Sequence, residues 1–533
     1  MSIPVLGSRS LTLAFLFLGS FALALAEAAV PTRIFDVKAF GAAGNGKTVD
    51  TDAINRAILA AAAAGGGTVF FSPGVYLSAS IRLKDNITLY LEAGSTIEAA
   101  DEQTATFDVP EPNEWSDTLH YQDFGHSHWQ NSLIWGIGLK NVSIVGPGLI
   151  HGRGLDAGFD RFADSSKGDQ RYHANPAGSG NKAIALRDCR NVVLRDFSIL
   201  HGGWFAVLAT GVDNLTIDNL KIDTNRDGMD IDACNNVRVT RCSVNSPWDD
   251  GICLKASYAL GKVRHCENIT ISDCLLAGNF DEGSLLDGTF KRSAPEYKSY
   301  RTGRIKFGTE SNGDFRNIAI TNCVFDDCRG FAIESVDGSH IEDVAISNIT
   351  MRHVANAPIF IRLGSRLRGP ANTPVGTIRR ISIDNLVASD ADWNLGCVIS
   401  GLPGHPIEAL HLSNVRIQQQ GGGTKELGER VPPENEASYP EPSMFGDMPS
   451  YAFFFRHVQD ITMTHVTIDA VNPEARPAFV LDDVREAYFD HLDVTRGAGA
   501  PRFDLRGVTD FSVTDSRGIA DTTRAGPGLH EKF

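Results

Sequence analysis

Two short acidic segments of the sequence carry residues that could do chemistry. Asn225–Asp230 reads NRDGMD and Trp248–Lys255 reads WDDGICLK, so Asp249 and Asp250 follow Asp227 after 22 and 23 positions. If the three carboxyl groups lie close together, they cannot all ionise freely, and at least one pKa should rise. A protonated carboxyl beside an ionised one is what glycoside hydrolysis needs, because one protonates the leaving oxygen while the other activates water. The alternative is a ladder of aspartates that caps turns or binds Ca²⁺.

A repeated phrase surrounds these segments and predicts how they are positioned. A polar residue, an alternating apolar strand, an Asn, Asp or Cys corner and a second strand recur from Asn191, Asn214 and Asn236 onward. Alternation of apolar and polar residues is typical of β-strands, and a period in the low twenties excludes the longer helical repeats and propellers. The Leu frame of a leucine-rich horseshoe is absent. We therefore predict an all-β chain: a single right-handed parallel β-helix with long loop insertions. Successive coils lie about 4.8 Å apart, which would place Asp227 beneath Asp249 and Asp250.

The N-terminal region predicts a leader and a cap. Arg9, the apolar run of residues 11–25 and the small residues after it are typical of a signal peptide over residues 1–28, although an N-terminal membrane anchor is an alternative. We expect residues 29–533 to form one catalytic domain that is exported to the periplasm or the extracellular space, with no membrane span after signal removal. An Ala-rich helix from Thr51 or Asp52 to the glycines at 65–67 is expected to cover the first coil.

Charge and cysteine content exclude several classes of function. The chain has 49 Lys and Arg against 65 Asp and Glu, a net charge of −16, which argues against nucleic acid and anionic membranes as partners. The nine cysteines are odd in number, and Cys242, Cys274 and Cys323 occupy the same place in the repeat. This pattern predicts stacked buried thiols rather than a disulfide framework, with oxidation of Cys323 and Cys328 left open.

Several insertions interrupt the repeat and are candidates for carrying function. They cover residues 108–130, 154–181, 280–303 and 419–450. The first is rich in aromatic and His residues, which either stack on sugar rings or hold the loop to the protein; a His-based metal site there is the least favoured interpretation. Five Asn-x-Ser/Thr sequons lie in repeat strands, and we expect them to belong to the coil pattern rather than to carry glycans: Asn86, Asn141, Asn214, Asn268 and Asn348.

The phrases NRDGMDID and WDDGICLK, set on β-helix repeats, resemble the N-T-D and D-D motifs of glycoside hydrolase family 28, the polygalacturonase and rhamnogalacturonan hydrolase family. The opening FDVKAFGAAGNGKTVDTDAINRAI is similar to the first coil of bacterial members. The resemblance implies inverting hydrolysis of a pectic bond without a metal cofactor. By motif position it implies Asp249 as the general acid, with Asp227 and Asp250 holding the water.

The sequence departs from the family pattern at two places. The family's Gly-His motif has no counterpart, since the corresponding stretch GNFDEGSLLDG offers Asp281 and Glu282. The Arg-x-Lys clamp for a substrate carboxylate is expected one coil further, where Ala332 and Glu334 stand. Arg304-Ile305-Lys306 matches the clamp but lies one coil too early, so it either compensates in the cleft or is a surface strand. The predicted substrate contacts are Asn225, Lys255, Asp281, Glu282, Arg304, Lys306 and Glu334.

The missing clamp weakens the case for a plain polygalacturonase, because an acidic protein without fixed cations would repel a polyuronate. We therefore expect a rhamnogalacturonan-type hydrolase, whose substrate alternates neutral rhamnose with galacturonate. The alternatives are a polygalacturonase of endo or exo action, a Ca²⁺-dependent pectate lyase, and a non-catalytic carbohydrate-binding β-helix. The expected partner is a pectic poly- or oligosaccharide, and a monomer is expected.

Overall fold

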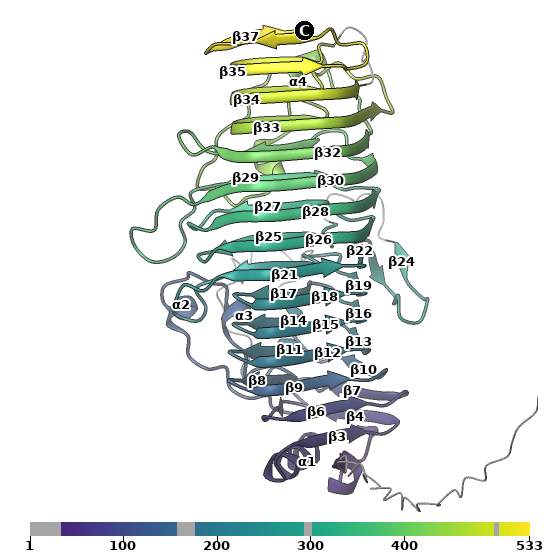
Figure 1. Cartoon of the computed structure of the whole chain (residues 1–533). Coiled ribbons are helices and arrows are strands. Elements are labelled where there is room, and N and C mark those ends of the chain that lie inside the picture. Colours follow the sequence, from purple (N-terminus) through teal and green to yellow (C-terminus); the bar gives the residue numbers. More distant parts are fainter. Residues whose placement is uncertain (1–32, 157–175, 293–300, 495–499) are drawn as a thin grey trace, which may run out of the picture. The chain divides into compact units, whose positions relative to one another are not determined.

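The computed structural model describes residues 33–156, 176–292, 301–494 and 500–533 as a column of stacked coils (Figure 1). The predicted signal peptide of residues 1–28 lies outside the described residues. The strands of the coils pair in parallel with the strands one coil further along the chain, which confirms the predicted parallel β-helix. In the part of the chain that the structure describes, no helix is long and apolar enough to cross a membrane.

Three parallel ladders run along the column. The ladder that carries the acidic segments contains β5 (Ile81–Arg82), β8 (Ile134–Ile137), β11 (Lys182–Arg187), β14 (Phe205–Thr210), β17 (Asp227–Asp232), β20 (Ile252–Ala256), β25 (Ile305–Ser311), β27 (Phe331–Ser335), β29 (Ile359–Leu363) and β31 (Cys397–Ser400). The second contains β1 (Ile34–Asp36), β3 (Gly67–Phe71), β6 (Ile87–Leu91), β9 (Lys140–Val145), β12 (Arg190–Arg195), β15 (Asp213–Asp218), β18 (Asn235–Thr240) and β21 (Cys266–Ser272). The third contains β2 (Asn45–Val49), β4 (Gly74–Ser78), β7 (Ser95–Ala99), β10 (Leu149–His151), β13 (Ser198–Leu200), β16 (Lys221–Asp223), β19 (Ser243–Asn245) and β22 (Leu275–Ala277).

Towards the C-terminus the strands lengthen, so that one strand joins two or three ladders. These long strands are β26 (Phe315–Asp326), β28 (His340–Arg352), β30 (Thr377–Ala391), β32 (Ile407–Gln419), β33 (Phe453–Ala470), β34 (Phe479–Val494) and β35 (Phe503–Thr514). Among them, β33 and β34 join all three ladders. The short helices α2 (Glu114–Asp117), α3 (Phe124–Ser127) and α4 (Lys425–Gly428), and the 3₁₀ turns η1 (Val37–Phe40) and η5 (Pro442–Phe445), all lie outside the ladders. Figure 1 shows α2 and α3 beside the coils of β8 to β17.

The core is a stack of like residues, one from each coil. Val192, Leu215, Val237, Ile269 and Ile318 are in register on successive strands of the second ladder. Each is at most 2% exposed and belongs to one continuous apolar cluster. Neighbouring residues of the same strands point outward, so the alternation seen in the sequence places one face of every coil in the core.

Both ends of the column are covered. Helix α1 (Thr51–Ala63) begins at the predicted residue and buries Ala53, Ile54, Ala57, Ile58 and Ala61 at the first coil. At the other end β36 (Thr522–Arg524) and β37 (Leu529–Lys532) pair antiparallel with β35, a cover that we did not predict. Strand edges at the ends of a stack would otherwise be open to pairing with other chains.

Asparagine ladders mark the corners of the coils. Asn141, Asn191 and Asn214 have φ of 56° to 57°, a left-handed conformation that Asn tolerates. Their side-chain amides donate to the Asn of the preceding coil at 2.8 to 2.9 Å. The sequon residues Asn141 and Asn214 thus belong to the coil pattern, as expected. All nine cysteines are buried and free, which confirms the predicted buried thiols.

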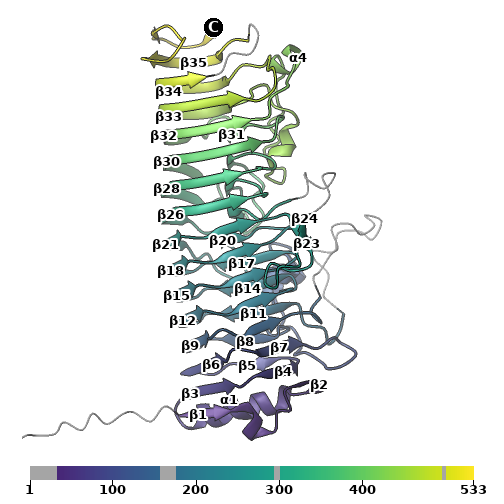
Figure 2. The ribbon, with the colours of Figure 1, turned by 90° about the vertical axis from the view of Figure 1, so that its right-hand side faces the viewer.

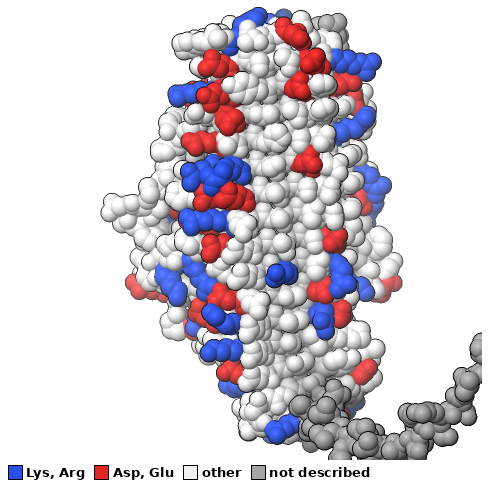
Figure 3. Space-filling model, viewed as in Figure 1, with Lys and Arg blue, Asp and Glu red and all other residues white. Residues whose placement is uncertain are grey.

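On the face shown in Figure 3, Lys and Arg alternate with Asp and Glu along the edges of a largely uncharged strip. This face offers no continuous basic area of the kind that binds a phosphate backbone.

Candidate functional site

The acidic segments of two successive coils meet on one face. Asp227 opens β17, while Asp249 and Asp250 lie in the turn before β20, the strand that pairs with β17. One oxygen of each carboxylate lies within 4.8 Å of the other two. The turns are joined by hydrogen bonds from the Gly228 amide to the Asp250 carbonyl and from the Gly251 amide to the Arg304 carbonyl, each 2.9 Å. The structure therefore brings the three predicted catalytic residues together.

The glycine after each acidic turn is required by the stacking. A Cβ atom on Gly228 would lie 2.4 Å from the carbonyl oxygen of Gly251, and one on Gly251 would lie 3.0 Å from that of Gly303. Real Cβ atoms essentially never come closer than 3.0 Å to another heavy atom, so a Cβ on Gly228 would force a shift, while one on Gly251 would lie at the limit. Glycine therefore lets consecutive acidic turns approach closely enough for their carboxylates to share one patch.

Asp227 and Asp250 have opposite electrostatic environments. Burial, then the nearby carboxylates of Asp249 and Asp230, raise the pKa of Asp227 well above the ordinary carboxyl value. Burial alone would raise the pKa of Asp250 too, but Lys306 and Arg304 outweigh it and lower that pKa far below the ordinary value. The Arg304 Nε donates to Asp250 at 2.8 Å, and the Lys306 Nζ lies 3.3 Å from it. Asp227 therefore holds its proton to higher pH than its neighbour Asp250.

Asp249 is the carboxyl most open to the cavity. Its side chain is 30% exposed, against 4% for Asp227 and 2% for Asp250. Its Oδ1 accepts from the Asp250 amide at 3.0 Å, and an Arg226 nitrogen lies 3.4 Å from its Oδ2. Two carboxyl groups roughly 6.5–9.5 Å apart typically indicate an inverting enzyme. The nearest oxygens of these three groups lie closer together than that, within 4.8 Å. Inversion here is therefore implied by the family resemblance and not by the spacing.

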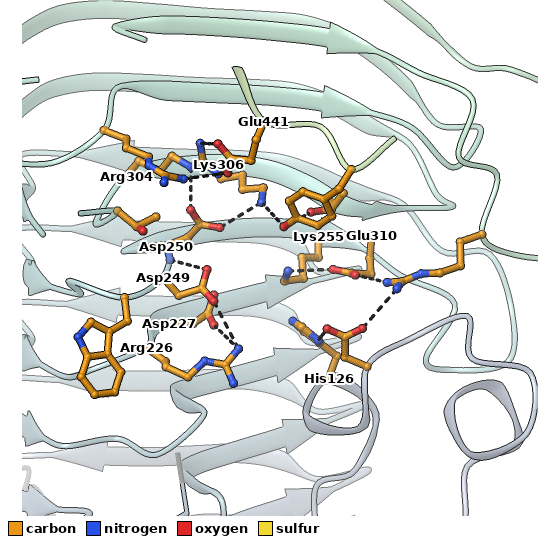
Figure 4. Close-up of a pocket in the computed structure, with 17 residues that line it drawn as sticks. His126, Arg226, Asp227, Asp249, Asp250, Lys255, Arg304, Lys306, Glu310 and Glu441 are labelled. Atoms are coloured by element: carbon orange, nitrogen blue, oxygen red, sulfur yellow. Dashed lines mark hydrogen bonds and ion pairs between the residues drawn. The ribbon is translucent and has the colours of Figure 1, made fainter. Parts of the chain in front are cut away.

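These carboxylates open into a cavity of about 300 Å³ (Figure 4). The figure shows Asp227, Asp249 and Asp250 gathered on one side, with His126, Lys255 and Glu310 on the other. The lining comes from widely separated segments: Asp123, His126, Arg226, Asp227, Trp248, Asp249, Asp250, Lys255, Thr302, Arg304, Lys306, Thr309, Glu310, Arg329, Arg368, Tyr439 and Glu441.

The 419–450 insertion closes the C-terminal side of the cavity. Its residues Phe445 and Met448 pack on Phe360, Val398 and Phe454, which face outward from the coils beyond the acidic turns. The insertion then contributes Tyr439 and Glu441 to the cavity wall. The cavity is thus bounded on this side by a packed segment of the chain itself.

Buried arginines fix this wall in place. Arg362 donates to the Glu434 carbonyl at 2.8 Å, and Arg456 donates to the Pro432 carbonyl at 3.0 Å. Both arginines extend from the coils and are 1% exposed. Because buried guanidinium groups need several acceptors, removing these contacts would be costly, and the insertion is held as a rigid part of the fold.

The 108–130 loop closes the N-terminal side. Phe124 and Trp129 pack against Phe205 and Leu208, and the Trp129 Nε1 donates to Thr210 at 3.1 Å. These two rings are therefore buried against the coils, where they hold the loop and cannot stack on a sugar. Of the histidines in this loop, His126 lines the cavity.

Three of the predicted substrate contacts line the cavity. They are Lys255, Arg304 and Lys306. Lys306 pairs in register with Cys253 on one side and Ala332 on the other, so Arg304-Ile305-Lys306 does lie one coil after the acidic pair. At 2% exposure each, Arg304 and Lys306 are buried beside Asp250, and the surface-strand alternative is wrong.

Asn225 and Glu334 do not line this cavity. Asn225 lines a smaller adjoining pocket with His201 and Phe280, and Trp248 borders both pockets. Glu334 is fully buried behind Lys306, 3.7 Å from its Nζ, and the burial raises its pKa to about 7. The prediction that Glu334 contacts substrate is corrected, because the coil stacking leaves its carboxylate no path to the cavity.

The Asp281 and Glu282 prediction rested on a wrong coil assignment. β23 (Phe280–Glu282) pairs antiparallel with β24 (Lys291–Arg292) in a separate two-stranded hairpin, while β25 forms the next coil (Figure 2). The side chains of Asp281 and Glu282 lie outside what the structure describes. The position that we gave to them is taken by Thr302 and Arg304, which precede β25 and line the cavity.

Sequence reasoning missed most of the remaining wall. Arg226 and Trp248 adjoin the acidic residues in sequence, and this adjacency was the available signal. Glu310 follows Lys306 on β25, at a position where alternation would bring both to the same face. The insertions 108–130 and 419–450 were candidates for function, but no pattern placed the following loop residues at this cavity: Asp123, His126, Arg329, Arg368, Tyr439 and Glu441.

Two groups at this cavity could offer three ligand atoms to a metal ion. They are Asp227, Asp249 and Asp250, and Asp123, His126 and Glu310. A cation at the first group would have to compete with Arg304 and Lys306 for Asp250. Glu310 already contacts Lys255 and Arg368, so the second group is compensated in the same way.

Comparison with known proteins gives distant matches. A family model described as rhamnogalacturonase A/epimerase, pectate lyase-like, matches residues 34–145, and one described as right handed beta helix region matches residues 171–294. A probable polygalacturonase of Vitis vinifera is 22% identical over 399 residues, covering 71% of this chain and 73% of that protein.

Solved structures share the fold. An exopolygalacturonase of Thermotoga maritima aligns with a TM-score of 0.57 at 20% identity, covering 73% of this chain and 88% of the other. A family 28 exopolygalacturonase of Yersinia enterocolitica aligns with a TM-score of 0.57 at 17% identity, covering 91% of this chain and 79% of the other. The right-handed parallel β-helix is thereby shown, and the chain is polygalacturonase-like.

Proposed function

We propose that this chain, a distant relative of the polygalacturonases of glycoside hydrolase family 28, is an exo-acting hydrolase that removes sugars from the ends of pectic chains. The observation that carries the proposal is a patch of three Asp carboxylates inside a cavity closed on both sides by packed loops. A polymer running through the site would meet Tyr439 and Glu441 on one side and the 108–130 loop on the other. A chain end avoids both obstacles.

Each carboxyl has a role that fits its surroundings. Asp250, held ionised by Arg304 and Lys306, takes a proton from the attacking water. Asp249, the most exposed of the three, gives a proton to the leaving oxygen as the glycosidic bond breaks. Asp227, whose pKa is raised by burial and by the neighbouring carboxylates, holds its proton to higher pH than Asp250 and can offer an O–H to the water. One proton enters the site from water and one leaves it with the product alcohol.

The cavity is lined by several positively charged side chains, although the chain as a whole is acidic. Six cationic side chains line it: Arg226, Lys255, Arg304, Lys306, Arg329 and Arg368. They reduce the repulsion that a uronate would meet in an acidic protein, which supports polygalacturonan as the substrate.

Rhamnogalacturonan is the second candidate, and one observation favours it. Each of the six cations is already ion-paired with a carboxylate of the protein. The coil expected to carry the clamp has Ala332 and Glu334 in its place. A neutral rhamnose in one subsite needs no cation, so the alternating polymer remains a reasonable substrate.

The test is to incubate the purified protein with polygalacturonan and with rhamnogalacturonan and to follow reducing ends, ultraviolet absorbance and viscosity, with and without EDTA. We expect reducing ends to rise while viscosity falls slowly and absorbance stays flat in both conditions. Absorbance that rises and is stopped by EDTA would indicate a Ca²⁺-dependent lyase. Binding without new reducing ends on either polymer would indicate a non-catalytic β-helix.

A further inference from the structure

The cavity has a second wall, opposite the catalytic carboxylates, whose side chains come from distant segments. We define this wall as His126 from α3, Lys255 from β20, Glu310 from β25 and Arg368 from the loop after β29. His126, Lys255 and Glu310 are each at most 6% exposed. Figure 4 shows them across the cavity from Asp227, Asp249 and Asp250.

His126 has unused hydrogen-bonding capacity at this wall. Neither ring nitrogen forms a hydrogen bond with any residue that the structure describes, although Nε2 lies 3.2 Å from Asp230 and Nδ1 lies 3.9 Å from Asp123. The ring centroid lies 4.7 Å from that of Phe205, which fixes its position. Nε2 therefore faces the buried Asp230 carboxylate, and Nδ1 is the ring atom left to bond a ligand.

The charges on the wall disfavour a sugar carboxylate. The Lys255 Nζ contacts Glu310 at 2.9 Å, and Arg368 contacts both Glu310 and Asp123. With Asp230 behind His126, the carboxylates near this wall are at least as numerous as the cations. Hydroxyl groups suit such a surface, because each can donate to a carboxylate and accept from a ring N–H.

We propose that the His126–Glu310 wall binds the hydroxyl edge of the terminal sugar and thereby selects the non-reducing chain end. This inference rests on the proposed function. In a galacturonan the hydroxyl that carries the next sugar is free only on the non-reducing terminal residue. A wall that bonds this hydroxyl excludes internal residues, and it turns the sugar's carboxylate toward Arg304, Arg329 and Lys306.

The experiment compares two substrates that differ at the terminal ring. One is trigalacturonate, and the other is a lyase-made trimer whose unsaturated terminal ring lacks that hydroxyl. We expect wild-type kcat/KM to favour the saturated trimer by at least about 10-fold, the effect of one buried hydrogen bond. In His126→Ala the ratio of kcat/KM for the saturated trimer to that for the unsaturated trimer should fall to about 2 or less. This fall should come from a lower kcat/KM on the saturated trimer, while kcat/KM on the unsaturated trimer stays the same.

A matched control is His120→Asn, an exposed residue of the same loop outside the cavity with φ of 53°, which Asn tolerates. It should keep the wild-type ratio. If His126→Ala does not fold, judged by its thermal unfolding, His126→Gln replaces it and should retain part of the preference. An unchanged ratio in either folded variant overturns the inference, as does a wild-type ratio near 1.

Two further outcomes distinguish a failure of this inference from a failure of the proposed function. If wild-type protein cleaves neither trimer nor the polymers, the proposed function itself is wrong. If EDTA removes the wild-type preference, Asp123, His126 and Glu310 hold a cation and do not contact the sugar directly, which overturns the inference and leaves the hydrolase in place.

Discussion

At the residue scale, Asp227 and Asp250 show how two buried carboxyls on neighbouring coils can have opposite tendencies to ionise. Both carboxyls are buried, but only Asp250 faces Arg304 and Lys306, while Asp227 faces Asp249 and Asp230. The neighbouring charges therefore decide which of two buried carboxyls ionises, as expected when like and unlike partners compete with desolvation.

Removing the proposed acid tests the assignment most simply. We expect Asp249→Asn to retain less than a few per cent of wild-type turnover, because an amide cannot protonate the leaving oxygen. Asp249 is partly exposed, so the variant should keep the wild-type thermal unfolding temperature. Activity above that level in a correctly folded variant would show that another group is the acid.

The pH dependence of activity should reflect the different electrostatic environments of Asp227 and Asp250. Activity should fall as pH rises through the raised pKa of Asp227, and it should persist in acid because the pKa of Asp250 is low. In Lys306→Met the pKa of Asp250 rises, so the acid-side loss of kcat/KM should move to higher pH. A variant whose acid limb stays in place would show that Lys306 does not keep Asp250 ionised.

At the element scale, the stacking of acidic turns depends on glycine. Gly228→Ala would bring a methyl group to 2.4 Å from the Gly251 carbonyl. We expect it to lower the unfolding free energy by about 1–3 kcal/mol and activity by at least about 10-fold, because the carboxylates must move apart. The comparison is Gly404→Asn, a left-handed position with open space around it, which should behave like wild type. Thermal unfolding and turnover measure both effects.

The coils themselves were predictable from the sequence because a period of 22 to 23 residues repeats with little interruption around Asp227. The same period failed after Ala277, where the β23–β24 hairpin is inserted between two coils. Local pattern cannot distinguish an inserted hairpin from a coil, since only the pairing partner differs. The assignment of Asp281 and Glu282 to the next coil is wrong for that reason.

At the scale of the whole molecule, two loops decide what the site can accept. The 108–130 loop and the 419–450 insertion reach the cavity from segments far apart in sequence. Their closure depends on long-range contacts, such as those of Phe124 with Phe205 and of Phe445 with Phe360. The sequence marked both as insertions but carried no periodic signal for where His126, Tyr439 or Glu441 would lie.

Opening one wall should change the mode of action. We expect replacement of residues 436–441 by a short Gly-Ser linker, which removes Tyr439 and Glu441, to let internal chain segments enter. Viscosity of polygalacturonan should then fall faster per bond cleaved, and products longer than one sugar should appear early. Phe445 and Met448 remain in place, so the cover over the coils should survive. An unchanged product profile in a folded variant would show that this wall does not limit access.

One measurement tests the central claim most directly: cleavage of trigalacturonate in heavy-oxygen water, with early products analysed by mass spectrometry. Water attack at the non-reducing terminal sugar predicts the label in released galacturonate and none in digalacturonate. Products that carry no label, or that are unsaturated, would contradict hydrolysis by the three aspartates.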